Sequence, residues 1–144
     1  MYKKIVVALD ESKEAERALE SAIELAGQLK SDLTILTVSE PLPSYAGFID
    51  SEMPGAKQKL LDERNAFYCQ LQKQGIERAT AAGIQAKGVI VEGDEVQSIL
   101  NHLTSNRIDL LVIGRRHHST MSQFWGGTLR AIAEKSCCSI LGVY

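Results

Sequence analysis

The sequence lacks any long apolar run, a cysteine framework and a strong net charge, and each absence excludes a class of protein. No stretch approaches the roughly 18 apolar residues that a membrane-spanning helix requires. The three cysteines are odd in number, and Cys137 and Cys138 are adjacent, so no disulfide framework is indicated. A formal net charge of -2 argues against nucleic-acid binding through bulk electrostatics. We therefore expect neither a membrane nor a nucleic-acid partner.

The sequence also lacks a secretory signal and the common signatures of catalysis. Its first apolar run ends at Asp10, too early for a signal peptide, which indicates a cytoplasmic protein. There is no Walker-type Gly-x-x-x-x-Gly-Lys-Ser/Thr motif and no obvious catalytic base. A metal centre built from the pairs His117-His118 and Cys137-Cys138 is disfavoured, because adjacent residues cannot easily share one tetrahedral ion. We predict no catalytic and no metal-binding residues.

What the sequence does contain is a regular alternation of strand-like and helix-like segments. Continuous apolar runs of this kind are typical of strands buried on both faces. The predicted strands are Ile5 to Leu9, Leu33 to Val38, Ile84 to Val91, Ile108 to Ile113 and Ser139 to Tyr144. The predicted helices start near Ser12, Lys57, Asp94 and Thr128, and the second places Leu60, Phe67, Leu71 and Ala79 on one face. A loop with all three prolines separates the second strand from the second helix.

This alternation predicts one α/β domain over residues 1–144, with an open five-stranded parallel sheet and helices on both faces. Right-handed crossovers require the chain to start near the centre of the sheet and to reverse direction once. The strand order 3-2-1-4-5 satisfies this requirement. Ligands of such Rossmann-like folds bind beyond the carboxyl ends of the strands at the switch point, here between the first and fourth strands. Asp10 and Gly114 end those two strands, so both are expected at one crevice.

The last 37 residues contain the features of a phosphate-binding corner. Gly114 ends the fourth strand, and Gly126-Gly127-Thr128 opens the last helix. Glycines let a backbone approach a ligand closely, and the free N–H groups at a helix N-terminus attract anions. An ordinary strand–loop–helix connection with turn glycines would have the same pattern, so these residues alone leave both interpretations open.

Over essentially its whole length the chain resembles the universal stress protein family. Members of the ATP-binding branch carry a glycine, two residues, a second glycine, nine residues and then Gly-Ser or Gly-Thr. Here Gly114 is followed by Arg115-Arg116, then by His117 in place of the second glycine, then by nine residues to Gly126 and by Gly127-Thr128. The first glycine, the spacing and the Gly-Thr end match the family pattern.

The resemblance implies a set of residues that would bind ATP or another adenine nucleotide, with or without Mg²⁺. Asp10 would lie beside the ribose and base, although a helix-capping role for this carboxylate is the alternative. Val38 would pack on the base, and Gly114 would approach the ribose and α-phosphate. Gly127 and Thr128 would offer a backbone N–H and a hydroxyl to the phosphates. The full implied set is Ala8, Asp10, Val38, Ile113, Gly114, Arg116, His117, Gly127, Thr128 and Leu129, the last through its backbone only.

The departure at His117 leaves two outcomes open. The histidine ring, with Arg115 and Arg116, either donates to the phosphate tail or fills the space that a phosphate would occupy. The first outcome implies an adenine-nucleotide-binding regulator or sensor of stress, with at most slow ATP hydrolysis. The second implies a protein that binds shorter nucleotides, or a nucleotide-free regulatory module.

The final predicted strand indicates self-association. In the order 3-2-1-4-5, Ser139 to Tyr144 lies at a sheet edge, and it contains no lysine or proline that would protect that edge. Many relatives in the family pair through this strand. We therefore expect a homodimer through the C-terminal strand.

Overall fold

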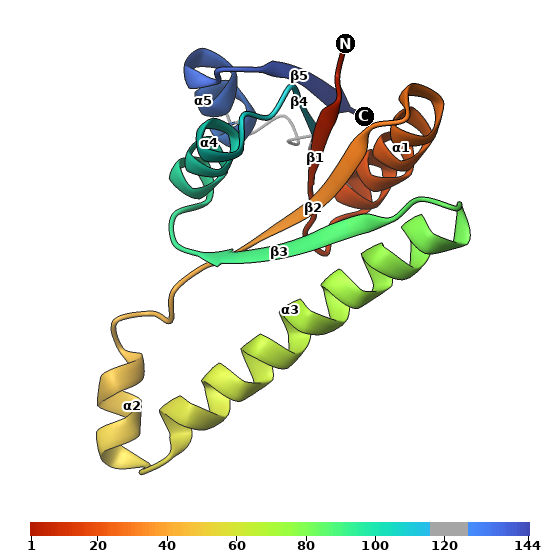
Figure 1. Ribbon diagram of the computed structural model, residues 1–144. Coiled ribbons are helices and arrows are strands. Elements are labelled where there is room, and N and C mark those ends of the chain that lie inside the picture. Colours follow the sequence, from red (N-terminus) through yellow and green to blue (C-terminus); the bar gives the residue numbers. More distant parts are fainter. Residues whose placement is uncertain (116–126) are drawn as a thin grey trace.

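The computed structural model describes residues 1–115 and 127–144, which form a parallel sheet between two layers of helices (Figure 1). The strands are β1 (Lys4–Ala8), β2 (Asp32–Ser39), β3 (Ala86–Glu92), β4 (Leu110–Gly114) and β5 (Ser139–Val143). The helices are α1 (Lys13–Leu29), α2 (Ala46–Glu52), α3 (Ala56–Ala81), α4 (Glu95–Asn106) and α5 (Gly127–Lys135). None of the described helices is both long enough and apolar enough to cross a membrane.

The sheet has the order β3-β2-β1-β4-β5 and every pairing is parallel, which confirms the predicted topology. Strands β2 and β3 are added on one side of β1, and β4 and β5 on the other side. The direction of strand addition therefore reverses between β1 and β4, where Val7 pairs with Val112. On the far side of β1, Ala8 pairs with Leu36 of β2. The switch point therefore lies between the two strands at which the sequence placed it.

Alternating residues of the strands form two cores, one on each face of the sheet. On one face, α1 and α3 cover a cluster that includes Ile5, Val7 and Ile35. On the other face, α4 and α5 cover a cluster that includes Val6, Leu36 and Leu111. Both faces of the central strands are buried because each βα crossover returns a helix to the sheet.

Local sequence signals explain where most helices begin and end. Ser12 is the N-cap of α1, and its hydroxyl accepts a hydrogen bond from the N–H of Ala15 at 3.1 Å. Asp94 caps α4 in the same way, accepting from the N–H of Gln97 at 2.9 Å. Beyond α3, Gly83 takes a φ of +77°, a left-handed conformation that favours glycine.

The region between β2 and the sheet-packed part of α3 departs from the sequence prediction. The segment predicted as a proline-containing loop includes the helix α2, and α3 extends with α2 beyond the sheet (Figure 1). The face on which the sequence places Leu60, Phe67, Leu71 and Ala79 is not buried along its whole length. Ala79 is fully buried, but Leu60 is 39% and Phe67 48% exposed. The apolar spacing indicated a helix correctly, but only its C-terminal half has a sheet to pack against.

Candidate functional site

The candidate site lies at the carboxyl ends of β1 and β4, where both strands run toward the first turn of α1. The chain leaves β1 through Leu9 and half-buried Asp10 and enters α1 within a few residues. Leu9 still pairs with β2, because its N–H donates to the carbonyl of Leu36 at 2.8 Å. The end of β1 is thus held between two strands and one helix, which fixes the position of Asp10.

The Asp10 carboxylate accepts a hydrogen bond from the N–H of Ser12 at 2.8 Å. This contact stabilises the turn from β1 into α1, immediately before the Ser12 cap. The local capping role that the sequence left open as an alternative is therefore present.

Gly114 lies against the backbone of α1, and this contact alone requires a glycine. A Cβ at this position would lie 2.5 Å from the carbonyl carbon of Glu14 and 2.7 Å from the nitrogen of Ala15. The end of β4 therefore packs directly on the helix that follows Asp10. The structure brings the ends of both switch-point strands to the first turn of α1. It also supplies a packing reason for the glycine that the sequence did not indicate.

The apolar residues of the implied site share the face of the sheet that α4 and α5 cover. Ala8, Val38, Ile113 and Leu129 all belong to the cluster on that face. Ile113 is 7% exposed, whereas Ala8, Val38 and Leu129 are only partly buried. The Leu129 side chain packs toward the sheet.

At the N-terminus of α5, Gly127 and Thr128 differ in their surroundings. Gly127 is the first residue of the helix, and a Cβ there would meet nothing within 4 Å among residues 1–115 and 127–144. Thr128 is partly buried, and its hydroxyl donates to the Glu95 carboxylate at 3.3 Å. Glu95 belongs to the first turn of α4, so the starts of α4 and α5 meet at this contact.

Glu95 is the residue that sequence reasoning missed. It places a carboxylate next to the hydroxyl that would face phosphate, in a corner where the sequence suggested no acidic group. The only available signal was its position directly after the Asp94 cap, because the start of a helix that follows β3 points toward the carboxyl edge of the sheet. Sequence spacing gave no indication that it would contact Thr128, which lies 33 residues away.

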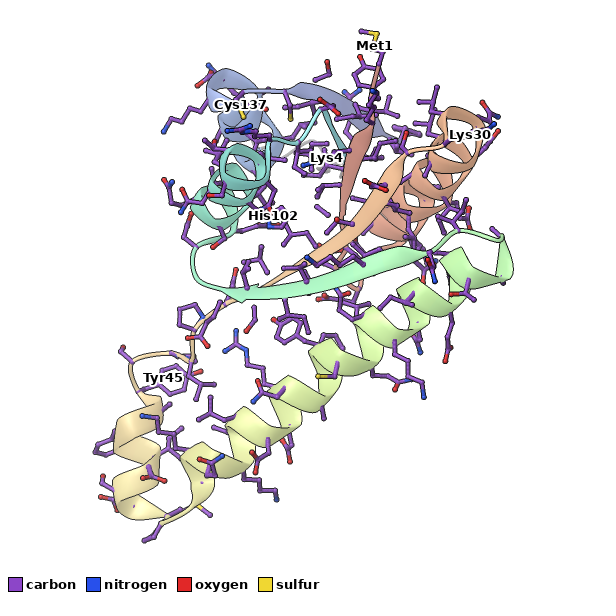
Figure 2. The ribbon with its side chains drawn as sticks, in the orientation of Figure 1. Met1, Lys4, Lys30, Tyr45, His102 and Cys137 are labelled. Atoms are coloured by element: carbon purple, nitrogen blue, oxygen red, sulfur yellow. The ribbon has the colours of Figure 1, made fainter. Side chains whose placement is uncertain are left out.

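Two of the implied residues, Arg116 and His117, lie outside the described residues, as does His118. Arg115 is exposed, and its N–H donates to the carbonyl of Val143 in β5. Figure 2 shows Cys137 beside α4, where its sulfur lies 3.6 Å from the Thr104 hydroxyl. Burial raises the pKa of the neighbouring Cys138 thiol. Within residues 1–115 and 127–144 no group of three or more histidines, cysteines and carboxylates could hold a metal ion.

Comparison with known proteins assigns this doubly wound fold to a family. The model of the universal stress protein family matches residues 1–143. Universal stress protein YxiE of Bacillus subtilis is 28% identical over 153 residues, covering 98% of each chain. The chain therefore belongs to the universal stress protein family.

Solved structures agree with this assignment. Universal stress protein UspA from Lactobacillus plantarum superposes with a TM-score of 0.82 at 19% identity, covering 100% of this chain and 99% of the other. A universal stress protein in complex with cAMP has a TM-score of 0.77 at 25% identity, covering 99% and 97%. The first likeness shows the fold, and the second is to a protein of this fold that binds an adenine nucleotide.

Proposed function

We propose that this universal stress protein binds ATP or another adenine nucleotide at the switch-point crevice and acts as a regulator in a stress response. The observation that carries the proposal is the meeting of β1, β4 and α1 at Asp10 and Gly114, beside an apolar face that includes Val38. Partly buried Ala8 and Val38 offer apolar surface to a base. The complex of a related protein with cAMP supports the choice of adenine.

In this proposal the phosphates lie at the N-terminus of α5, where unpaired backbone N–H groups attract anions. Gly127 is exposed and adds no side chain that would obstruct a phosphate. Thr128 supplies its hydroxyl, and Leu129 its backbone N–H. The proposal also assigns Arg116 and His117 to the phosphate tail on the family motif.

Glu95 bears on whether Mg²⁺ accompanies the nucleotide. A carboxylate beside the phosphates would repel them unless a cation lay between. Mg²⁺ binds oxygen ligands and is commonly held by one or two carboxylates together with substrate phosphates. The carboxylate of Glu95 and the hydroxyl of Thr128, 3.3 Å apart, are donors of the type that this ion prefers. We assign these two residues to Mg²⁺, which would neutralise charge at the phosphates.

The test is a titration of ATP into a variant that fills the helix start. Gly127→Leu adds bulk where the described structure has free space, so the fold should persist while affinity for ATP falls by about tenfold or more. Ala133→Leu, an addition of bulk to an exposed position of the same helix, is the matched control and should bind like the parent protein. Equal affinity in Gly127→Leu and the parent protein would place the nucleotide elsewhere.

A second function is favoured by the same Glu95–Thr128 contact. Because the Thr128 hydroxyl already donates to a carboxylate, the corner is satisfied without phosphate. With this contact in place, the protein could act as a regulatory module that binds no nucleotide. Glu95→Gln separates the two functions. If the phosphates of ATP lie beside Glu95, loss of its charge should make ATP binding less dependent on Mg²⁺. If the protein binds no nucleotide, the variant should not bind ATP with or without Mg²⁺.

We further propose that the protein forms a homodimer through β5. Among the described strands β5 pairs only with β4, so its outer edge presents unpaired backbone groups. Leu141 is 37% exposed on this strand, and Tyr144 at its end is 66% exposed. A two-fold axis would pair two such edges in antiparallel, self-complementary fashion.

A further inference from the structure

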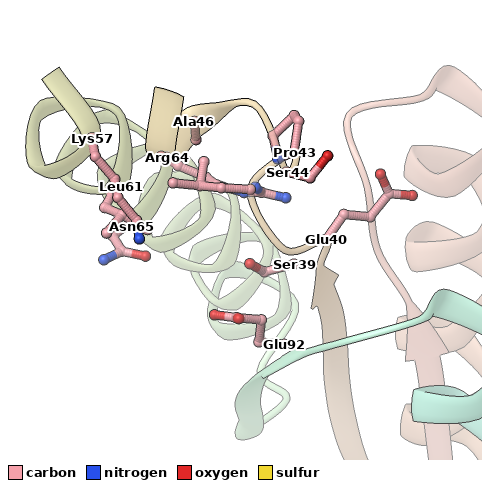
Figure 3. A pocket seen from close by; sticks show the side chains of 12 residues that line it. Ser39, Glu40, Pro43, Ser44, Ala46, Lys57, Leu61, Arg64, Asn65 and Glu92 are labelled. Atoms are coloured by element: carbon pink, nitrogen blue, oxygen red, sulfur yellow. The ribbon is translucent and has the colours of Figure 1, made fainter. Parts of the chain in front are cut away.

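A second cavity lies at the carboxyl ends of β2 and β3, between the sheet and the projecting part of α3. Its volume is about 390 Å³, and Figure 3 shows the side chains that line it. The strand register places Ser39 directly beside Glu92 at its floor. Arg64 and Leu61 of α3 and Leu42 of the loop before α2 form the walls.

This cavity and the proposed nucleotide crevice lie on opposite faces of β2. Val38 packs in the cluster covered by α4 and α5. Thr37 faces the other side, where its hydroxyl accepts from the Gln72 amide of α3 at 2.7 Å. Ser39 follows Thr37 by two positions and therefore shares its face. A ligand in this cavity would contact neither Val38 nor the end of β4.

Ser39 is the feature that points to a ligand. It is only 7% exposed, yet its hydroxyl has no hydrogen-bond partner within residues 1–115 and 127–144. Its backbone carbonyl is satisfied by the N–H of Gly93 at 3.0 Å, so only the hydroxyl remains available. A hydroxyl that opens onto a cavity and has no partner in the described chain is available to a ligand there, as both donor and acceptor.

Two side chains of opposite charge flank Ser39. Figure 3 shows it between Arg64 and Glu92, with both charged groups turned toward the cavity. No ion pair joins Arg64 or Glu92 to any other residue that the structure describes. Arg64 contacts the ring of Tyr68 instead, with its guanidinium carbon 5.8 Å from the ring centroid. Its planar fork of donors suits a carboxylate.

We propose that this cavity binds a free α-amino acid with an apolar side chain. Arg64 would bind the carboxylate, Glu92 the ammonium group, and Ser39 would donate or accept between them. Leu42 and Leu61 provide apolar surface for the side chain. Charged side chains of both signs line the cavity, because Glu40 and Lys57 border it together with Arg64 and Glu92. A purely anionic ligand would meet carboxylates of like charge, and a cation would meet Arg64 and Lys57. A ligand that carries both charges can pair with both kinds of group.

L-Leucine is the probe, titrated into the full-length protein while backbone amide resonances are followed by NMR. We expect a dissociation constant of about 1 mM or tighter, within the range open to so small a ligand. The shifted resonances should cluster at Ser39, Arg64 and Glu92. Two analogues divide the charges: 4-methylpentanoate keeps the carboxylate, and 3-methylbutylamine keeps the ammonium group. Each should bind about tenfold more weakly than leucine or worse.

Variants identify the residues. Arg64→Gln and Glu92→Gln should each weaken leucine binding by about tenfold or more, and Ser39→Ala by a smaller factor. Lys73→Gln, at an exposed position of the same helix outside the cavity, is the control and should match the parent protein. The proposal fails if leucine causes no shifts at about 10 mM, or if Arg64→Gln binds like the control. Equal affinity for 4-methylpentanoate and leucine would also overturn it, because the site would then recognise an anion alone.

Discussion

At the scale of single residues, Gly114 and Gly127 were predicted to serve one ligand, yet the structure constrains them in different ways. Gly114 is required by the fold, because any Cβ there would contact the backbone of α1 at 2.5 to 2.7 Å. In the part of the chain that the structure describes, nothing lies within 4 Å of a Cβ built at Gly127, so no contact there requires a glycine. Packing therefore explains why residue 114 is a glycine, whereas at residue 127 the proposed ligand would explain it.

This difference predicts that substitution by alanine destabilises the protein strongly at Gly114 and little at Gly127. Gly114→Ala should lower the free energy of unfolding by about 2 kcal/mol or more, since the helix backbone cannot move aside as a flexible side chain can. Gly127→Ala should change it by less than about 0.5 kcal/mol. Urea denaturation followed by circular dichroism measures both. Equal stability of the two variants would mean that β4 and α1 are not packed as closely as described.

At the scale of secondary-structure elements, α3 consists of two halves with different surroundings. Its C-terminal half is fixed to the sheet by buried Gln72, Gly75 and Ala79. The Gln72 amide donates to the carbonyl oxygens of Ile35 and Val89, so it joins the helix to two strands. The N-terminal half extends past the sheet and, with α2 and the loop before it, forms the wall of the second cavity.

Leucine substitutions in the two halves should therefore differ in effect. Ala79→Leu introduces extra volume at a fully buried position and should reduce the free energy of unfolding by about 1–3 kcal/mol. Ala66→Leu, at an exposed position of the other half, should stay within about 0.5 kcal/mol of the parent protein. Thermal or urea unfolding compares them. A large loss of unfolding free energy in Ala66→Leu would show that the N-terminal half of α3 is buried against another part of the protein or a second protomer.

Sequence patterns predicted the elements that are buried and missed what depends on contacts between distant residues. Strand order followed from continuous apolar runs and the right-handed crossover rule, and the Ser12 and Asp94 caps followed from local chemistry. The exposure of Leu60 and Phe67 could not be predicted, because apolar spacing does not reveal where the sheet ends. The Glu95–Thr128 contact and the Ser39–Glu92 pair also escaped prediction. Each joins residues that only the assembled sheet brings together.

At the scale of the whole molecule, the open sheet has two edges with different protection. The edge strand β3 carries the charged residues Lys87 and Glu92, whereas the edge strand β5 has exposed Leu141 and no charged side chain between Ser139 and Val143. Exposed edge strands usually carry a charged side chain that prevents pairing with another chain. Its absence here is the physical basis of the proposed homodimer.

A charge at this edge should therefore separate the protomers. Leu141→Lys places like charges near each other across a two-fold axis, so sedimentation should show a shift from twice the 15.8 kDa chain mass toward the monomer. Leu29→Lys adds the same charge at an exposed leucine at the end of α1 and should remain dimeric. A parent protein that sediments as a monomer at micromolar concentration would contradict the proposed pairing.

The measurement that tests the central claim most directly is a calorimetric titration of the full-length protein with ATP, ADP and AMP in the presence of Mg²⁺. Binding at the switch-point crevice predicts micromolar affinity, a binding free energy of about −8 kcal/mol, for at least one of the three. The rank order then shows how far the phosphate corner extends, since an obstructing His117 would favour AMP and a donating one would favour ATP. Absence of heat with all three nucleotides, from protein shown to be folded and free of bound nucleotide, would contradict the proposed function.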